Sequence, residues 1–239
     1  METAERAWWQ LSAAEAIKLQ REWARRVCRE LQLERPPRTV AGVDAAYGQG
    51  KVWGVAVVME LPSLRIREVS VAACREEFPY IPGLLSFREA PAILQALRSL
   101  SAPPDILLCD GQGIAHPRRL GIASHIGILT DLPTIGCAKS LLCGYMQGEL
   151  GENAGSTAPV WDAGELVAVA VRTRARVKPV YVSIGHRVDL PFAVEFVLHC
   201  CRGYRLPEPV RLADNLSRRA AHGHVSEHPR ASGEMHMPP

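Results

Sequence analysis

The sequence predicts an α/β protein with a mixed sheet that begins with three antiparallel strands, continues with parallel βα units and is flanked by helices. Two observations support this fold class. Three apolar runs at residues 39–46, 52–60 and 64–74 follow one another with turns too short to hold a helix between them. After residue 84, stretches with helical periodicity alternate with short apolar runs typical of buried strands. Such alternation favours parallel pairing.

The N-terminal region has apolar residues at helical spacing over residues 12–32, and Ser12 and Glu15 stand in the arrangement of a capping box. This pattern predicts an amphipathic helix before the antiparallel strands. Further along, the sequence predicts helices at 85–100, 121–130, 191–201 and 209–220, and strands at 106–110, 134–137, 166–171 and 180–184. We expect residues 1–221 to form a single domain, and residues 222–239 to be a disordered tail rich in histidine and proline.

Composition bounds the class of protein. The chain has 239 residues, 47% of them hydrophobic, and a net charge of only +3, so one large core is expected. Arginines gather at 118–119, 172–176 and 202–219. These clusters could follow a phosphate backbone or be ordinary solvated faces, and charge alone favours the second reading. No apolar run is long enough to span a membrane, and the seven cysteines form no CxxC pair. We expect a reduced, cytoplasmic monomer.

Two aspartates occupy positions where α/β proteins place their sites. Asp110 ends the apolar run 106–109 and is followed by a Gly-Gln-Gly turn, and Asp44 lies in a run of small and apolar residues. If the two strands are parallel neighbours, the two carboxylates emerge at one end of the sheet and could hold Mg²⁺, which prefers oxygen ligands. The alternative is that each residue only shapes a turn at the end of its strand.

Two further charged residues could complete such a site. Glu89 could bind the metal through water, or it could close a capping box with Ser86 at the start of a helix. Lys139 follows the apolar residues 135–138. Its ammonium group could meet negative charge on a phosphate, or simply extend to solvent.

The segment Pro79-Tyr-Ile-Pro-Gly83 should be stiff, because two prolines restrict its backbone. A stiff loop could drive Tyr80 and Ile81 as a wedge between stacked bases. The alternative is a buried aromatic residue that anchors a connection.

With these residues in view, the chain resembles the endonuclease V family, the deoxyinosine 3′ endonucleases. The resemblance is carried by Val40-Ala-Gly-Val-Asp44, 78–89 (FPYIPGLLSFRE), 110–125 (DGQGIAHPRRLGIASH), 133–139 (PTIGCAK), Gly185-His186 and 205–214 (RLPEPVRLAD). These segments follow the family's order and span roughly residues 10–220. The resemblance implies an RNase H-like fold and a DNA repair enzyme. Its implied reaction is Mg²⁺-dependent cleavage of the second phosphodiester bond 3′ of a deaminated adenine, with Mn²⁺ able to replace Mg²⁺, leaving 3′-hydroxyl and 5′-phosphate ends.

The same resemblance implies roles for individual residues. Asp44 and Asp110 would bind the metal directly and Glu89 through water, while Lys139 would stabilise the phosphate. Asp214 stands where some members have histidine, so its role in binding metal or orienting water is open. The implied DNA-binding residues are Tyr80, Ile81, Pro82, Gly83, Gly111, Gly113, His116 and Arg118.

Two alternatives to a DNA enzyme remain. The same carboxylates could cut inosine-containing RNA, since nothing in the sequence shows whether the pocket requires a 2′-hydroxyl. A binding module that had lost its chemistry would also keep the fold, although all three acids and Lys139 are present.

Overall fold

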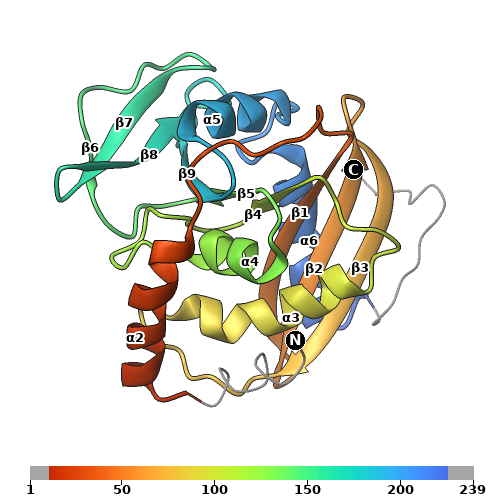
Figure 1. Cartoon of the computed structure of the whole chain (residues 1–239). Helices are drawn as coiled ribbons and strands as arrows, with labels where there is room; N and C mark the ends of the chain where they lie inside the picture. The colour runs from red at the N-terminus through yellow and green to blue at the C-terminus, as the bar shows by residue number, and fades with distance from the viewer. Residues whose placement is uncertain (1–10, 226–239) are drawn as a thin grey trace.

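The structure is a computed structural model that describes residues 11–225. It contains one nine-stranded sheet in the order β3-β2-β1-β4-β5-β9-β8-β7-β6 (Figure 1). The strands are β1 (Thr39–Gly48), β2 (Lys51–Glu60), β3 (Arg65–Arg75), β4 (Ile106–Cys109), β5 (Thr134–Ala138), β6 (Tyr145–Met146), β7 (Thr157–Asp162), β8 (Glu165–Val171) and β9 (Val180–His186). Most of the tail predicted at 222–239 lies outside the described residues.

Helices flank the sheet at the positions that the sequence periodicity predicts. They are α2 (Ala13–Trp23), the 3-10 turn η2 (Ala24–Arg26), α3 (Leu85–Arg98), α4 (Ile122–Thr130), α5 (Leu190–His199) and α6 (Glu208–Ala221). Among residues 11–225, no helix combines the length and the apolar character that a membrane span requires.

The sheet is mixed, as predicted. Strands β1, β2 and β3 form the antiparallel meander. Strand β4 then pairs with β1 in parallel, and β5 pairs with β4 in parallel, so β4-α4-β5 is the βα unit expected from the sequence. Strands β9, β8, β7 and β6 extend the sheet in antiparallel fashion. The parallel part is therefore confined to the centre of the sheet, beside β1.

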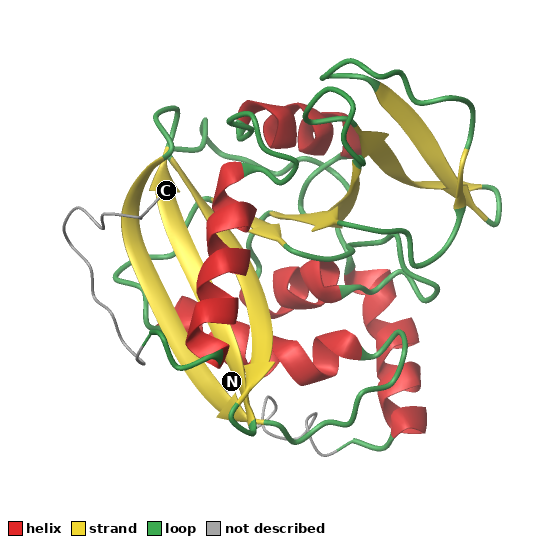
Figure 2. Ribbon diagram, turned by 180° about the vertical axis from the view of Figure 1, so that it is seen from behind, coloured by secondary structure: helices red, strands yellow, loops and turns green. Residues whose placement is uncertain are grey.

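The two faces of the meander are covered by different helices. A Cβ atom added at Gly42 of β1 would lie 2.0 Å from the carbonyl oxygen of Pro209 in α6. A Cβ atom at Gly54 of β2 would lie 2.2 Å from the carbonyl carbon of Ala92 in α3. Glycine is needed at both points because the helix backbone comes so close. Figure 2 shows α6 lying across the strands on the face opposite α3. Because side chains alternate along a strand, Asp44 shares the α6 face with Gly42.

Three expectations from the sequence need correction. The N-terminal helix ends near residue 26 and not at 32, because the backbone of Cys28 pairs with Arg187 and with the ring of His186. Strands β6 and β7 were not predicted. The alternative in which Ser86 and Glu89 form a capping box is wrong, because the N-cap of α3 is Leu84, two residues before Ser86, and no side chain caps the helix there.

Candidate active site

Two aspartates meet at the central strands. Val43 of β1 is in register with Cys109 of β4, and the Asp110 N–H donates to the Val43 carbonyl at 3.1 Å. Asp110, directly after β4, therefore lies beside Asp44, which lies within β1 just beyond its parallel pairing with β4, and the two aspartates are neighbours as the sequence predicted. The side chain of Asp110 is only 9% exposed. Such burial of a carboxylate is costly unless a cation or a hydrogen-bond donor faces it.

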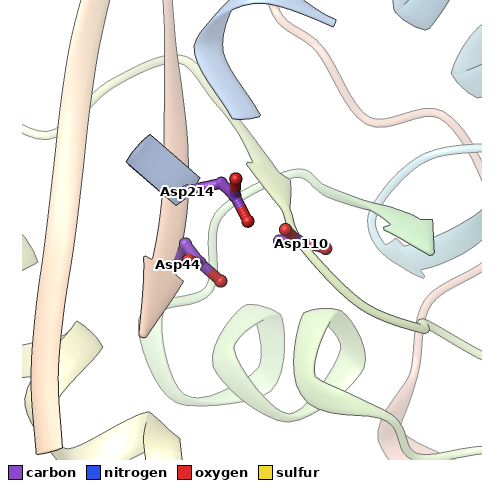
Figure 3. A group of neighbouring side chains, drawn as sticks. All are labelled: Asp44, Asp110 and Asp214. Carbon is purple, nitrogen blue, oxygen red and sulfur yellow. The ribbon is translucent and has the colours of Figure 1, made fainter. Parts of the chain in front are cut away.

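Helix α6 adds a third carboxylate to this pair. Carboxylate oxygens of Asp44, Asp110 and Asp214 all lie within 4.8 Å of one another (Figure 3). Ser217, one helical turn beyond Asp214, donates its hydroxyl to Asp44 Oδ2 at 2.5 Å. Arg218 forms an ion pair with Asp214. Asp214, Ser217 and Arg218 share one face of α6, because residues three and four apart are neighbours on a helix.

The crowding of these acids changes their protonation. Burial raises the pKa of Asp44 to about 7, and the neighbouring carboxylate of Asp110 adds to this rise. Burial also raises the pKa of Asp110, although Lys139 opposes the effect. For Asp214, hydrogen bonds from Arg218 and Lys139 outweigh burial and hold the pKa below its usual range. The cluster thus carries more negative charge than its own cations neutralise.

Lys139 follows β5 and reaches into the cluster. Its Nζ lies 2.5 Å from Asp110 Oδ2 and 2.6 Å from Asp214 Oδ1. Burial would lower the pKa of this ammonium group, but the two carboxylates outweigh burial and raise it, so the lysine stays charged. Arg205 donates to the backbone carbonyl of Lys139 at 2.6 Å and fixes the chain there. Lys139 therefore does not simply extend to solvent.

Glu89 faces the same cleft from α3 but lies outside the cluster of three. Tyr47 of β1 donates its hydroxyl to Glu89 Oε1 at 2.9 Å, and the Arg88 guanidinium lies 4.2 Å from the centre of the Tyr47 ring. Burial raises the pKa of Glu89 to about 8, with the Tyr47 hydrogen bond opposing the rise. A cleft of about 370 Å³ is lined by Asp44, Asp110, Asp214, Glu89, Lys139, Tyr47, Leu85 and Arg218, together with Ala45 and Ala46.

The donor set fits a hard divalent cation. Three carboxylates converge on one point and offer only oxygen atoms, the ligands that Mg²⁺ and Mn²⁺ accept. Burial, with a smaller contribution from neighbouring carboxylates, raises the pKa of Asp44 and Asp110, and a cation there would balance the buried negative charge. Asp44, Asp110 and Asp214 are the residues placed to hold it. Glu89 lines the same cleft but is not part of the cluster of three.

A second hollow adjoins the cleft and shares Leu85 and Asp110 with it. This pocket has a volume of about 210 Å³ and lies between the 80–86 segment and the 110–122 segment. Its lining includes Tyr80, Ile81, Pro82, Gly83, Gly111 and His116, which the sequence assigned to DNA binding. Tyr80 is 66% exposed at its rim, so this residue is not the buried anchor of the alternative reading.

Two of the predicted DNA-binding residues lie behind the pocket wall. The Gly113 N–H donates to Ser183 Oγ at 2.8 Å, and a Cβ atom at Gly113 would lie 1.9 Å from the Ile184 carbonyl oxygen. Arg118 turns toward the back of the 79–84 loop and donates to the Gly83 carbonyl at 2.7 Å. Both residues shape the pocket from outside.

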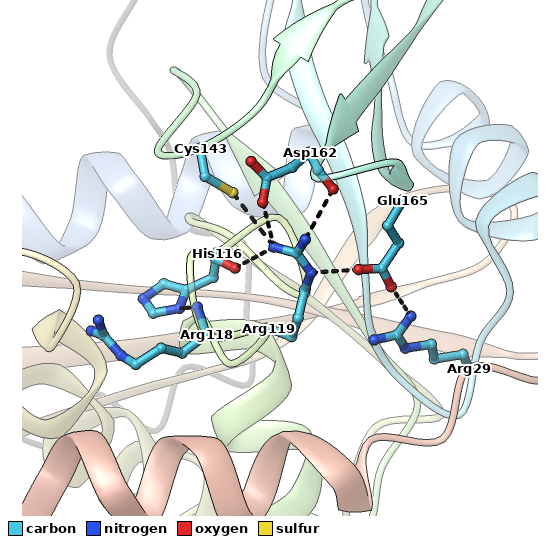
Figure 4. A network of polar contacts seen from close by, with 7 residues as sticks. All are labelled: Arg29, His116, Arg118, Arg119, Cys143, Asp162 and Glu165. Carbon is cyan, nitrogen blue, oxygen red and sulfur yellow. Dashed lines mark hydrogen bonds and ion pairs between the residues drawn. The ribbon is translucent and has the colours of Figure 1, made fainter.

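Arg119 joins the pocket to the far end of the sheet. Its guanidinium donates to the His116 carbonyl at 2.9 Å, to Asp162 Oδ2 at 2.7 Å and to Glu165 Oε2 at 2.6 Å (Figure 4). Glu165 also pairs with Arg29. This arginine, only 17% exposed in its side chain, is therefore neither a phosphate contact nor part of a solvated face. It holds the 116–119 turn against the β7–β8 hairpin.

Four residues of this site were not predicted from the sequence. Ser217 and Arg218 carry a usable signal, since they lie three and four residues beyond Asp214 on a predicted helix. Tyr47 lies in a predicted turn after the first strand, and nothing nearby in the sequence points to Glu89. Gln20 sits in the N-terminal helix and contacts the pocket loop 63 residues away. Contacts between residues so far apart in the chain cannot be predicted from local sequence patterns.

Comparison with known proteins agrees with this geometry. The family model for endonuclease V matches residues 21–215. An endonuclease V of Gloeobacter violaceus is 53% identical over 213 residues, which cover 87% of this chain and 86% of the relative. The crystal structure of endonuclease V from Streptomyces avermitilis superposes with a TM-score of 0.84 at 44% identity, covering 90% of this chain and 95% of that one.

A third relative was solved with nucleic acid. Ciona intestinalis endonuclease V, in complex with a 24-mer DNA containing an inosine followed by a ribo-adenosine, superposes with a TM-score of 0.76 at 29% identity. The match covers 88% of this chain and 98% of that one. The fold is RNase H-like, as in these structures. The chain therefore belongs to the endonuclease V family.

Proposed function

We propose that this protein is a DNA repair endonuclease that recognises deoxyinosine and hydrolyses the second phosphodiester bond 3′ of it, leaving 3′-hydroxyl and 5′-phosphate ends. The proposal depends on one observation, that the carboxylate cleft and the second pocket are adjacent and share Leu85 and Asp110. A cluster of three carboxylates lines one, and the other is a narrow pocket with an exposed tyrosine at its rim. The Ciona complex with inosine-containing DNA supports the choice of substrate.

Binding and cutting would use separate parts of the protein. A flipped base would enter the 210 Å³ pocket, while Tyr80 fills the space that the base leaves in the stack. The backbone beyond the lesion would then cross the carboxylate cleft. Because the pocket and the cleft are neighbours and not one cavity, the bond that is cut lies away from the base that is read.

The cleft would act on the phosphate with residues already in place. Asp44, Asp110 and Asp214 would hold Mg²⁺, or Mn²⁺ in its place, with Glu89 contacting it through water. When bound, the ion would polarise the phosphate and favour ionisation of the attacking water. Hydroxide oxygen would bond to phosphorus as the bond to the 3′ oxygen breaks, and that oxygen would take up a proton. Lys139 would neutralise charge that develops on the phosphate oxygens.

We also propose that residues 1–221 are one domain that acts as a monomer. The continuous sheet from β3 to β6 supports the single domain. All seven cysteines lie within residues 11–225 and are thiols, not disulfides, which suits a reducing compartment such as the cytoplasm.

A nicking assay tests the proposal. Wild type in Mg²⁺ should cut a duplex with one deoxyinosine and leave the matched adenine duplex intact. Asp44→Asn and Asp110→Asn should both lose this activity, because each removes a carboxylate from the cluster. Equal cutting by all three proteins would contradict the proposal, as would wild-type cutting of the adenine duplex at the same rate.

RNA is the second candidate substrate. The Ciona complex places a ribonucleotide directly after the inosine, which makes the sugar at that position worth varying. Matched oligonucleotides with inosine in an all-DNA strand, in an all-RNA strand, and in DNA followed by one ribonucleotide would rank the substrates directly. A protein that binds all three and cuts none, even in Mn²⁺, would be a binding module instead.

A further inference from the structure

One buried amide connects the N-terminal helix to both walls of the base pocket. Gln20 of α2 is completely buried. Its Nε2 donates to the Gly83 carbonyl at 3.0 Å and to the Leu120 carbonyl at 3.1 Å. Its Oε1 accepts a hydrogen bond from Arg118 Nε. Gly83 belongs to one wall of the pocket, and Leu120 directly precedes Gly121 and Ile122, which line the other. A single side chain thus ties the two walls together.

The Gly83 carbonyl is the centre of this arrangement. It accepts from Gln20, from Arg118 Nη2 at 2.7 Å and from His116 Nε2 at 2.9 Å. The Arg118 N–H donates to His116 Nδ1 at 3.1 Å, so Nδ1 is the acceptor and Nε2 carries the hydrogen. A carbonyl oxygen has two lone pairs, and three donors converge on this one. The plane of the Gly83 peptide is therefore fixed from three directions.

The position of this peptide matters for base recognition. Gly83 has φ of +78°, and its neighbours Tyr80, Ile81 and Pro82 line the same pocket. Most of the pocket lining comes from loops, which hold their shape through contacts such as these. Without the amide of Gln20, the Leu120 carbonyl loses a side-chain donor in a buried place, and the loop loses its link to α2.

We propose that Gln20 is a positioning residue for base selection, which sets the spacing between the two pocket walls and so the preference for hypoxanthine over adenine. Gln20 lies behind the wall and does not reach the base. It acts through Gly83 on one side and through the 116–121 turn on the other. This inference rests on the proposed function, since it assumes that the pocket receives a flipped base.

The experiment measures binding without cutting. Dissociation constants for duplexes that contain inosine or adenine at one position are compared by fluorescence anisotropy in EDTA, for the full chain. Gln20→Met keeps the length of the side chain and removes all three hydrogen bonds. Gln20→Glu keeps the shape and the acceptor for Arg118 but removes both donors to the carbonyls. Ile17→Ala is the matched control, because Ile17 lies on α2 one turn before Gln20, packs against the apolar core and has no side-chain donor for the Gly83 and Leu120 carbonyls.

The ratio of the two constants is the informative quantity, because general loss of stability weakens both complexes. Gln20→Met and Gln20→Glu should each reduce the preference for inosine by about tenfold, the expected scale for losing buried hydrogen bonds. Ile17→Ala should keep the wild-type ratio despite a lower melting temperature. A wild-type ratio in either folded Gln20 variant would overturn the inference. Absence of any preference in the wild type would instead overturn the proposed function, and the inference with it.

Discussion

The cleft and the pocket are neighbours, but they are built in opposite ways. The cleft is made by regular elements, β1, α6 and the ends of β4 and β5, and it gathers acids whose charges repel one another. The pocket is made mainly by loops, with the first residues of α3 and α4, and a hydrogen-bond network holds its wall at the Gly83 carbonyl. A rigid scaffold can hold mutually repelling charges until a cation relieves them. Loops need hydrogen bonds in the unbound state to present a defined shape.

The largest effect expected from this contrast is at Lys139. Lys139→Met should lower the nicking rate by about 100-fold or more, because the cleft would lose a fixed positive charge at the phosphate. The preference for inosine in binding should stay at the wild-type value, since Lys139 does not line the pocket. Single-turnover nicking and anisotropy measure the two quantities, with the exposed Lys178→Met as the control. A lost binding preference in Lys139→Met would show that cleft and pocket are not separable.

A substitution in the pocket wall should have the opposite effect, weakening the binding of inosine without changing the binding of metal in the cleft. Alanine at Gly83 requires a φ of +78°, and its Cβ would lie 2.7 Å from Arg118 Nη2. The left-handed backbone alone costs about 1–2 kcal/mol. Gly83→Ala should therefore weaken inosine binding by about tenfold, while leaving the affinity for Mn²⁺ intact.

Gly203→Ala controls for the backbone cost of Gly83→Ala. Gly203 has the same φ of +78°, but no atom lies within 4 Å of its added Cβ. If both variants lose inosine binding equally, the effect is general destabilisation and the wall has no special role.

A smaller effect on the nicking rate is expected from Tyr47, which does not bind the metal but donates a hydrogen bond to Glu89. Tyr47→Phe keeps the ring against Arg88 but leaves Glu89 without its hydrogen bond. The nicking rate should fall by about tenfold, the scale of one buried hydrogen bond. Tyr204→Phe is the matched control, because Arg211 lies over that ring in the same way, 4.3 Å from its centre. An unchanged nicking rate in Tyr47→Phe would mean that the hydrogen bond from Tyr47 to Glu89 does not contribute to the reaction.

Stability should depend on pH with opposite sign in the two regions. Asp44 has its pKa raised from 3.8 to about 7, so without metal its contribution is lost as pH rises through that window. Burial lowers the pKa of His116 from 6.5 to about 4, so its contribution is lost as pH falls through that window. Each slope is at most about 1.4 kcal/mol per pH unit.

Chemical denaturation in EDTA at several pH values measures these slopes. Asp44→Asn should reduce the fall in stability between pH 4 and pH 7, to which Asp110 and Glu89 also contribute. His116→Gln should reduce the rise between pH 4 and pH 6.5, to which His125 and His186 also contribute. Adding Mg²⁺ should stabilise the wild type more at pH 8 than at pH 5, because protons compete with the ion at low pH. Equal stabilisation at both values would contradict the raised pKa of Asp44.

The same division explains what the sequence could predict. Asp44 and Asp110 were correctly predicted to be neighbours, because short apolar runs indicate buried strands and the parallel pairing of β1 with β4 brings the residues after Val43 and Cys109 side by side. Strand β7 was missed because Pro159 interrupts its pattern, and a proline argues against a strand in the interior of a sheet. The N-terminal helix was predicted too long, because the pairing of Cys28 with Arg187 involves residues far apart in the chain.

The supporting residues could not be predicted in the same way. Glu89 fits a local capping motif with Ser86, but burial in the cleft and the hydrogen bond from Tyr47 place it differently. Gln20 lies among polar and charged residues on a helix whose sequence says nothing of Gly83. Local patterns therefore indicated which acids could meet, and only the tertiary structure showed what holds them and the pocket in place.

Binding of Mn²⁺, followed by electron paramagnetic resonance without nucleic acid, tests the central claim most directly. The wild type should bind the ion, and Asp44→Asn and Asp110→Asn should each weaken binding by at least about 100-fold, since changes that only support a ligand already cost 10- to 100-fold. Wild-type affinity in both variants would contradict the account, because the two aspartates would then not share a cation.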